Sequence, residues 1–339
     1  MKPFDFLQPA TIDEALSAWT DGAAWLGGGT NLVDLMKTGA VQPDLVIDIT
    51  RLPGLNAVEV LPDGTTRIGA LVTNADLADH PEITARAPMV AEALLSGASG
   101  QLRNAATVAG NILQSPRDAF FAHQEPASDP LASAGSLSVL GAEGTATAVN
   151  PSDFCVPLVA LDAVVELQGP DGPREIPLAG LHQLPGQGAR TALRPGELIL
   201  ALRLPPEAAG FAANARYLKV RDRTSFAFAM ASAAAALKID GGRITAARLA
   251  LGAVAPKPWR VAEAEEILTG QAPDPELFAR AAGAALAGAV EIGGNGWKID
   301  LARRTAARAL AMAAAGTPAR IPALPASPFG TTAGDHAHA

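Results

Sequence analysis

Three consecutive glycines place the strongest constraint on how this chain can fold. Gly27 to Gly29 lie between a short apolar run, Ala23 to Leu26, and a segment from Leu32 to Met36 with apolar residues at helical spacing. Without a Cβ, glycines let successive backbone N–H groups turn toward one anion, and a helix start adds the positive end of its dipole. The stretch therefore predicts a strand, a phosphate-binding turn and a helix. A glycine-rich surface turn is the alternative.

Two common phosphate loops are absent from this stretch. It contains neither G-x-G-x-x-G nor G-x-x-x-x-G-K-[ST]. The first is the glycine pattern of nicotinamide-binding Rossmann domains, and the second is the P-loop of NTPases. Both of these classes are therefore disfavoured.

A second stretch, Gln101 to Gln114, again combines small residues, amide side chains and a glycine beside an apolar run. Thr107 and Asn111 have side chains that donate hydrogen bonds, and Gly110 allows a ligand to approach the backbone closely. Two such loops suit a ligand whose pyrophosphate is clamped from two sides.

Further motifs extend along the chain in a fixed order: Asn150 to Asp153, Leu193 to Glu197, Tyr217 to Arg223, Gly252 to Arg260 and Lys298 to Arg304. Together with the two loops, they resemble the flavin subunit of the molybdenum hydroxylases. This group includes xanthine dehydrogenase, carbon monoxide dehydrogenase and the bacterial aldehyde oxidoreductases. The resemblance covers nearly the whole chain, and it is closest to the aldehyde oxidoreductase branch.

The resemblance implies an α+β architecture. It predicts a two-subdomain FAD-binding fold of the PCMH/vanillyl-alcohol-oxidase type, followed by a C-terminal α+β domain of the CO dehydrogenase flavoprotein type. The expected boundaries are 1–55 for the first FAD-binding subdomain, 56–180 for the second with a loop insertion at 115–150, 210–316 for the C-terminal domain, and 317–339 for a disordered tail.

It also implies a set of cofactor-binding residues. The glycine loops would hold the FAD diphosphate through backbone N–H groups, Asp153 would hydrogen-bond the sugar or ribityl part, and Lys219 would lie near the isoalloxazine. The full set is Leu26, Gly27, Gly28, Gly29, Thr30, Asn31, Leu32, Thr107, Val108, Ala109, Gly110, Asn111, Asp153, Leu193 and Lys219. The alternatives are a helix N-cap for Asp153, a surface position for Lys219 and ordinary packing for Leu193.

The implied function is electron transfer within a three-subunit enzyme. Substrate would be oxidised at the molybdenum cofactor of a large partner, and electrons would pass through two [2Fe–2S] clusters of a small partner to FAD and then to an external acceptor. The five histidines show no metal-ligand spacing, and no G-x-S-x-G motif is present, so we expect no catalytic acid or base and no metal site in this chain. A free-standing FAD oxidoreductase and a flavin-free scaffold remain the alternatives.

The cysteine content indicates whether the insertion at 115–150 can ligate an iron–sulfur cluster. In the aldehyde oxidoreductase branch, the resemblance implies four cysteines there that ligate a [4Fe–4S] cluster. Residues 115–150 contain no cysteine, and the one cysteine of the chain, Cys155, lies in an apolar run where a buried structural thiol is expected. We therefore expect FAD without a cluster in this chain.

Charge and hydropathy limit the kinds of partner and the cellular compartments that suit this chain. The net charge is −8, and no basic run is available to neutralise phosphates, which argues against nucleic-acid binding. The N-terminus lacks an apolar signal region, and no window is long and apolar enough to span a bilayer. We expect a cytoplasmic protein, or a periplasmic one exported together with a partner subunit.

Local patterns predict the elements. Thr11 to Glu14 form a capping box that opens a helix. The remaining expected elements are a strand at 45–49, a hairpin over 58–72, a helix at 88–96, paired strands at 225–237 and 244–254, and helices at 258–269, 274–289 and 298–315.

Overall fold

The computed structural model describes residues 1–114, 137–142 and 147–319. Most of the expected insertion at 115–150 and nearly all of the expected tail at 317–339 lie outside the described residues. Thr317 is held by the fold, because its hydroxyl lies 2.7 Å from the carbonyl oxygen of Ala212 and accepts from the N–H of Ala215. The prediction that disorder begins at residue 317 is therefore wrong for Thr317.

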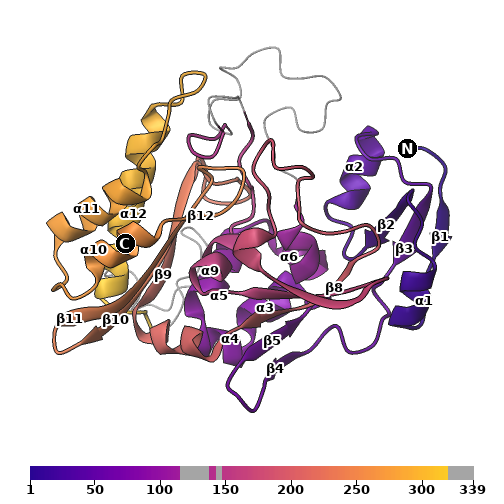
Figure 1. The fold of residues 1–339 in the computed structure, drawn as a ribbon, viewed down its shortest axis with the longest axis horizontal. Coiled ribbons are helices and arrows are strands. Elements are labelled where there is room, and N and C mark those ends of the chain that lie inside the picture. Colours follow the sequence, from indigo (N-terminus) through magenta and orange to yellow (C-terminus); the bar gives the residue numbers. More distant parts are fainter. Residues whose placement is uncertain (115–136, 143–146, 320–339) are drawn as a thin grey trace.

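The N-terminal part is a small parallel sheet with two helices (Figure 1). Its strand order is β1-β3-β2. The elements are β1 (Asp5–Leu7), α1 (Ile12–Ser17), β2 (Ala23–Leu26), α2 (Leu32–Thr38) and β3 (Leu45–Asp48). Thr11 caps α1 by accepting a hydrogen bond from the N–H of Glu14 at 3.1 Å, which confirms the predicted helix start.

The middle part is a five-stranded antiparallel sheet of order β4-β5-β8-β6-β7, with short helices on it. Its strands are β4 (Val58–Val60), β5 (Thr66–Gly69), β6 (Val164–Gly169), β7 (Gly172–Pro177) and β8 (Leu198–Leu204). Its helices are α3 (Asn74–Asp79), α4 (Pro81–Arg86), α5 (Pro88–Ser96), α6 (Gly100–Ala105), α7 (Val108–Ile112) and α9 (Cys155–Ala160). Since β8 pairs with both β5 and β6, this sheet extends beyond residue 180, where we expected the second subdomain to end.

The C-terminal part is a four-stranded antiparallel sheet of order β12-β11-β10-β9, with three helices. The strands are β9 (Ala215–Val220), β10 (Ala231–Asp240), β11 (Arg243–Gly252) and β12 (Trp259–Arg260), and the helices are α10 (Ala262–Leu268), α11 (Pro275–Ala285) and α12 (Trp297–Ala314). In Figure 1, these helices cover the outer face of the sheet, while α5 and α9 lie on the inner side. The sheet is thus buried on both faces.

Two predictions in this region need correction. Residues 225–230 precede the strand, which begins at Ala231, and Phe226 has a left-handed φ of 49° that no regular strand accommodates. The expected helix at 258–269 begins only at Ala262, because Trp259 and Arg260 pair with β11 instead. The third helix, at Trp297–Ala314, agrees with its prediction, whereas the second ends at Ala285 rather than 289.

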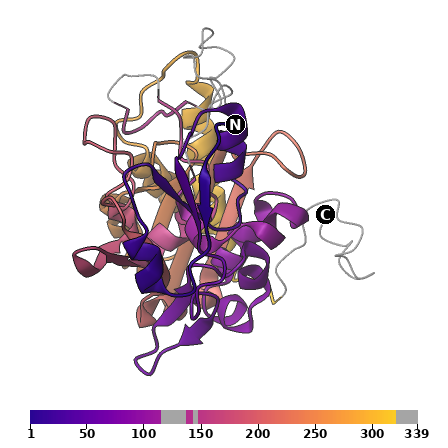
Figure 2. The same ribbon diagram turned by 90° about the vertical axis from the view of Figure 1, so that its right-hand side faces the viewer.

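The N-terminal and middle parts lie next to each other, with the chain between β2 and α2 facing the segment that joins α6 to α7. Figure 2 shows the three N-terminal strands side by side in front of the rest of the molecule. A separate apolar core, which includes Ala15, Ile47 and Leu198, joins the N-terminal part to β8. None of the described helices is long and apolar enough to span a bilayer.

Candidate functional site

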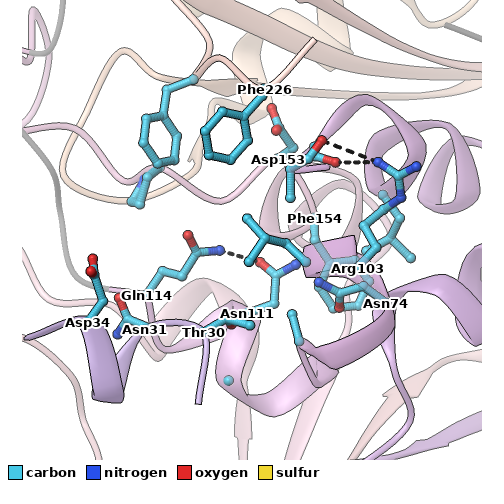
Figure 3. Close-up of a pocket in the computed structure, with 18 of the residues that line it drawn as sticks. Thr30, Asn31, Asp34, Asn74, Arg103, Asn111, Gln114, Asp153, Phe154 and Phe226 are labelled. Atoms are coloured by element: carbon cyan, nitrogen blue, oxygen red, sulfur yellow. Dashed lines mark hydrogen bonds between the residues drawn. The ribbon is translucent and has the colours of Figure 1, made fainter. Parts of the chain in front are cut away.

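A cavity of about 590 Å³ lies where all three parts of the fold meet. Its walls come from the starts of α2 and α3, the α5–α7 region, the segment before α9, and the chain from β9 to β10. In Figure 3, Thr30 and Asn111 lie between Asp34 and Gln114 on one side and Arg103 and Asn74 on the other. A cavity of this size suits a small molecule or cofactor rather than a macromolecule.

The first loop contributes backbone donors. Gly29 adopts a left-handed φ of 73°, and its carbonyl accepts the N–H of Val33 to begin α2. Among the described residues, no acceptor is found for the N–H groups of Gly28, Gly29 and Thr30. Of these residues, Gly29 and Thr30 line the cavity, so their N–H groups at the helix start are available to an anion there.

The second loop has a different role from the one we predicted. The N–H groups of Val108 and Ala109 donate to the carbonyls of Val72 and Ala70, at 3.0 and 3.1 Å. The N–H of Gly110 donates to the hydroxyl of Thr107, the N-cap of α7, at 3.2 Å.

The backbone N–H of Asn111 is also used within the protein, because it donates to the carbonyl of Thr107 at 2.9 Å. These four backbone donors are therefore occupied within the protein. These hydrogen bonds disfavour the prediction that the four N–H groups hold a diphosphate, because two are used by the segment after β5 and two by Thr107, the N-cap of α7.

The side chain of Asn111 remains available from this loop. Its Oδ1 accepts hydrogen bonds from the hydroxyl of Ser152 at 2.7 Å and from Nε2 of Gln114 at 2.8 Å. Both contacts turn the oxygen away and orient the amide nitrogen as the remaining donor. The second loop thus presents a side-chain donor beside the backbone donors of the first.

The glycines at 27 and 28 bring the two loops together. A Cβ on Gly27 would lie 2.9 Å from the hydroxyl of Thr107, and one on Gly28 would lie 1.7 Å from the carbonyl oxygen of Ala105. Neither glycine lines the cavity. Their lack of a side chain therefore serves the approach of two backbones rather than direct contact with a ligand.

A buried ion pair forms another part of the wall. Nζ of Lys219 donates to Oδ2 of Asp153 at 2.7 Å and to the carbonyl of Ser96 at 3.2 Å. Oδ1 of the same carboxylate accepts from the hydroxyl of Tyr217 at 2.6 Å. Burial, followed by the nearby Asp153, raises the pKa of Tyr217 well above its usual value, so this hydroxyl stays protonated. The pair fixes both side chains.

Comparison with known proteins agrees with this architecture. A family model described as the FAD binding domain in molybdopterin dehydrogenase matches residues 2–207, and one described as the CO dehydrogenase flavoprotein C-terminal domain matches residues 216–317. The aldehyde oxidoreductase FAD-binding subunit PaoB of Escherichia coli K12 is 43% identical, with 93% of this chain and 99% of that protein covered. This chain belongs to the FAD-binding subunits of the molybdenum hydroxylases.

Other members of this family are similar to this chain in sequence and in structure. The carbon monoxide dehydrogenase medium chain of Hydrogenophaga pseudoflava is 30% identical over 84% of this chain and 86% of its own length. A solved structure of carbon monoxide dehydrogenase from the same organism superposes with a TM-score of 0.75 at 30% identity, and it covers 93% of this chain and 99% of its own. The predicted α+β architecture and the family resemblance are thereby confirmed.

The predicted cofactor residues of this flavin subunit fall into two groups. Those lining the cavity are Gly29, Thr30, Asn31, Gly110, Asn111, Asp153 and Lys219. Those outside its lining are Leu26, Gly27, Gly28, Leu32, Thr107, Val108, Ala109 and Leu193. Leu193 is half-buried against the large apolar core. The alternative that the Pro-Ser-Asp triplet at 151–153 caps a helix is met by Ser152, whose hydroxyl accepts from the N–H of Cys155 at the start of α9, while the carboxylate of Asp153 pairs with Tyr217 and Lys219.

Sequence reasoning missed several wall residues. Arg103 donates to the carbonyls of Gly97 and Ala98 at 2.8 and 3.3 Å, and burial lowers its pKa. Phe226 and Phe228 line the cavity with 55% and 50% of their surface exposed. No local pattern marks these residues, because the cavity joins segments that are distant in sequence.

Proposed function

We propose that this chain holds FAD in the cavity and acts as the electron-transferring flavin subunit of a three-subunit aldehyde oxidoreductase. The observation that carries the proposal is the pair of backbone N–H groups at Gly29 and Thr30, which line the cavity and have no acceptor among the described residues. An anionic diphosphate supplies acceptors for such donors at a helix start. The family membership supports the same cofactor.

The side chains of the wall suit a dinucleotide with this charge. The lining includes four basic and two acidic residues: Lys37, Arg103, Lys219, Arg223, Asp34 and Asp153. Asp153 neutralises Lys219, so the remaining balance is positive. Bound FAD supplies redox chemistry, and this chain would bind, orient and shield it.

The proposed partners are a small subunit with [2Fe–2S] clusters and a large subunit with the molybdenum cofactor. Their existence is supported by the relatives, whose names describe them as FAD-binding subunits or medium chains. Within the described residues, no group of three or more His, Cys, Asp or Glu side chains is placed to hold a metal ion. We assign oxidation of the substrate to the large partner, as the family resemblance implies.

The test is a visible absorbance spectrum of the purified full chain, together with iron analysis. Flavin bands without iron support the proposal, whereas broad iron–sulfur absorbance contradicts the expectation of FAD alone. A colourless protein that added FAD cannot reconstitute favours the flavin-free scaffold. Anaerobic addition of an aldehyde to the isolated flavoprotein provides a second test, because bleaching of the flavin without partners favours a free-standing oxidoreductase.

A further inference from the structure

The amide of Asn74 is a buried polar group in the cavity wall that the fold leaves unused. Asn74 is the first residue of α3, only 5% of its surface is exposed, and it lines the cavity. Its Oδ1 has no hydrogen-bond partner among the described residues. Buried oxygens in proteins are nearly always paired, so this exception needs an explanation.

Helix α3 does not require this side chain. Thr73 already caps the helix by accepting the N–H of Asp76 at 3.1 Å. The backbone N–H of Asn74 donates to the carbonyl of Ala106 at 2.8 Å, and this bond holds the residue beside the second loop. The backbone therefore positions Asn74, while its amide contributes nothing to the capping of α3.

The amide faces the same space as groups from other elements. Figure 3 places Asn74 next to Arg103, on the far side of Asn111 from Asp34. Arg103 is itself fixed by its hydrogen bonds to the backbone of the α5–α6 turn. This end of the cavity thus contains an amide without a hydrogen-bond partner among the described residues beside a fixed cation.

We propose that the side-chain amide of Asn74 hydrogen-bonds FAD and so helps to select the ligand. The inference rests on the proposed FAD function. The amide donates through Nδ2 or accepts through Oδ1, so it suits a diphosphate oxygen as well as a hydroxyl or a ring N–H of the cofactor.

The test is the variant Asn74→Leu in the full chain, a replacement of similar size without the amide. Two quantities are measured: the dissociation constant for FAD, by flavin fluorescence, and the melting temperature of the FAD-free protein. We expect binding to weaken by about 5- to 100-fold, because the group of FAD that contacts the amide loses its partner. The FAD-free variant should melt at the same temperature or higher, since a buried unpaired oxygen is removed.

Ser138→Ala is the matched control. Ser138 is fully buried, its hydroxyl oxygen also lacks a partner among the described residues, and it does not line the cavity. This variant should bind FAD as the wild type does. Weakened FAD binding in Ser138→Ala as large as in Asn74→Leu would overturn the assignment, because removing any buried oxygen would then have the same effect.

Competition with FMN and ADP identifies the end of the cofactor involved. A loss confined to ADP assigns the contact to the adenosine end, and a loss confined to FMN assigns it to the ribityl-isoalloxazine end. Unchanged FAD affinity in Asn74→Leu overturns the inference, as does a clear drop in the melting temperature of the FAD-free variant, which would indicate a structural role. Failure of the wild type to bind FAD overturns the proposed function itself.

Discussion

The close approach of the two loops makes Gly28→Ala the most informative substitution. A Cβ at this position would lie 1.7 Å from the carbonyl oxygen of Ala105, 2.6 Å from its carbonyl carbon and 3.1 Å from the Cα of Ala106. All three atoms belong to backbone, so no side chain can rotate to make room. The added methyl group must instead push the loops apart.

The size of the effect follows from these distances. The two backbones must separate by about 1.7 Å before the contact with the Ala105 oxygen reaches the 3.4 Å of ordinary van der Waals contact. Overpacking that side chains can absorb costs about 1–3 kcal/mol, and a rigid backbone contact lies at the upper end or above. We expect the free energy of unfolding to fall by about 3 kcal/mol and the melting temperature by roughly 4 °C.

FAD affinity should fall as well. A loop displaced on this scale cannot keep the N–H groups of Gly29 and Thr30 on a shared anion. Loss of one hydrogen bond to a charged group costs about 1.5–3 kcal/mol, so we expect binding to weaken by roughly tenfold or more. Urea unfolding of the FAD-free protein and fluorescence titration with FAD measure the two effects separately.

Gly100→Ala is the control for this substitution. Gly100 is the first residue of α6, and the nearest atom to a Cβ there is Nη2 of Arg103 at 4.0 Å. Alanine at such a position should leave stability unchanged or raise it by up to about 1 kcal/mol. The reasoning is refuted if Gly28→Ala differs from the wild type by less than about 0.5 kcal/mol and binds FAD normally.

Two further predictions concern buried charges. Lys219→Met should lower the free energy of unfolding by about 3–5 kcal/mol, because it leaves the Asp153 carboxylate buried with Tyr217 as its remaining partner. A decrease below about 1 kcal/mol in urea unfolding would contradict this prediction. Burial lowers the pKa of His182 from 6.5 to about 4. Between these pH values the unfolded state binds a proton that the native state does not bind. The free energy of unfolding should therefore fall by up to roughly 3 kcal/mol as the pH drops from about 6.5 to about 4. His182→Gln, which retains a donor for the carbonyl of Ile112, should lose this part of the pH dependence, and an unchanged profile would count against it.

Local signals in the sequence predicted local structure well. The capping box at Thr11 and the run of strand, glycine loop and helix from Ala23 to Met36 depend on neighbours in the chain, and both are found as expected. Local sequence signals did not predict which backbone N–H groups remain free, because segments distant in the sequence supply acceptors for them in the fold. Val108 and Ala109 looked like free donors in the sequence, but Val72 and Ala70 accept their hydrogen bonds in the fold.

What the sequence by itself determined is the family, the α+β class and the two loops, because these are written in the order of residue types along the chain. Only the tertiary structure decided how each group is used. Alanine content alone would make β10 a helix, yet its alternate residues pack against opposite cores, Ala234 on one side and Ala235 on the other. Small side chains allow both layers to approach the strand closely. In the same way, only the packing of α3 against the second loop places Asn74 in the cavity wall and leaves its oxygen without a partner among the described residues.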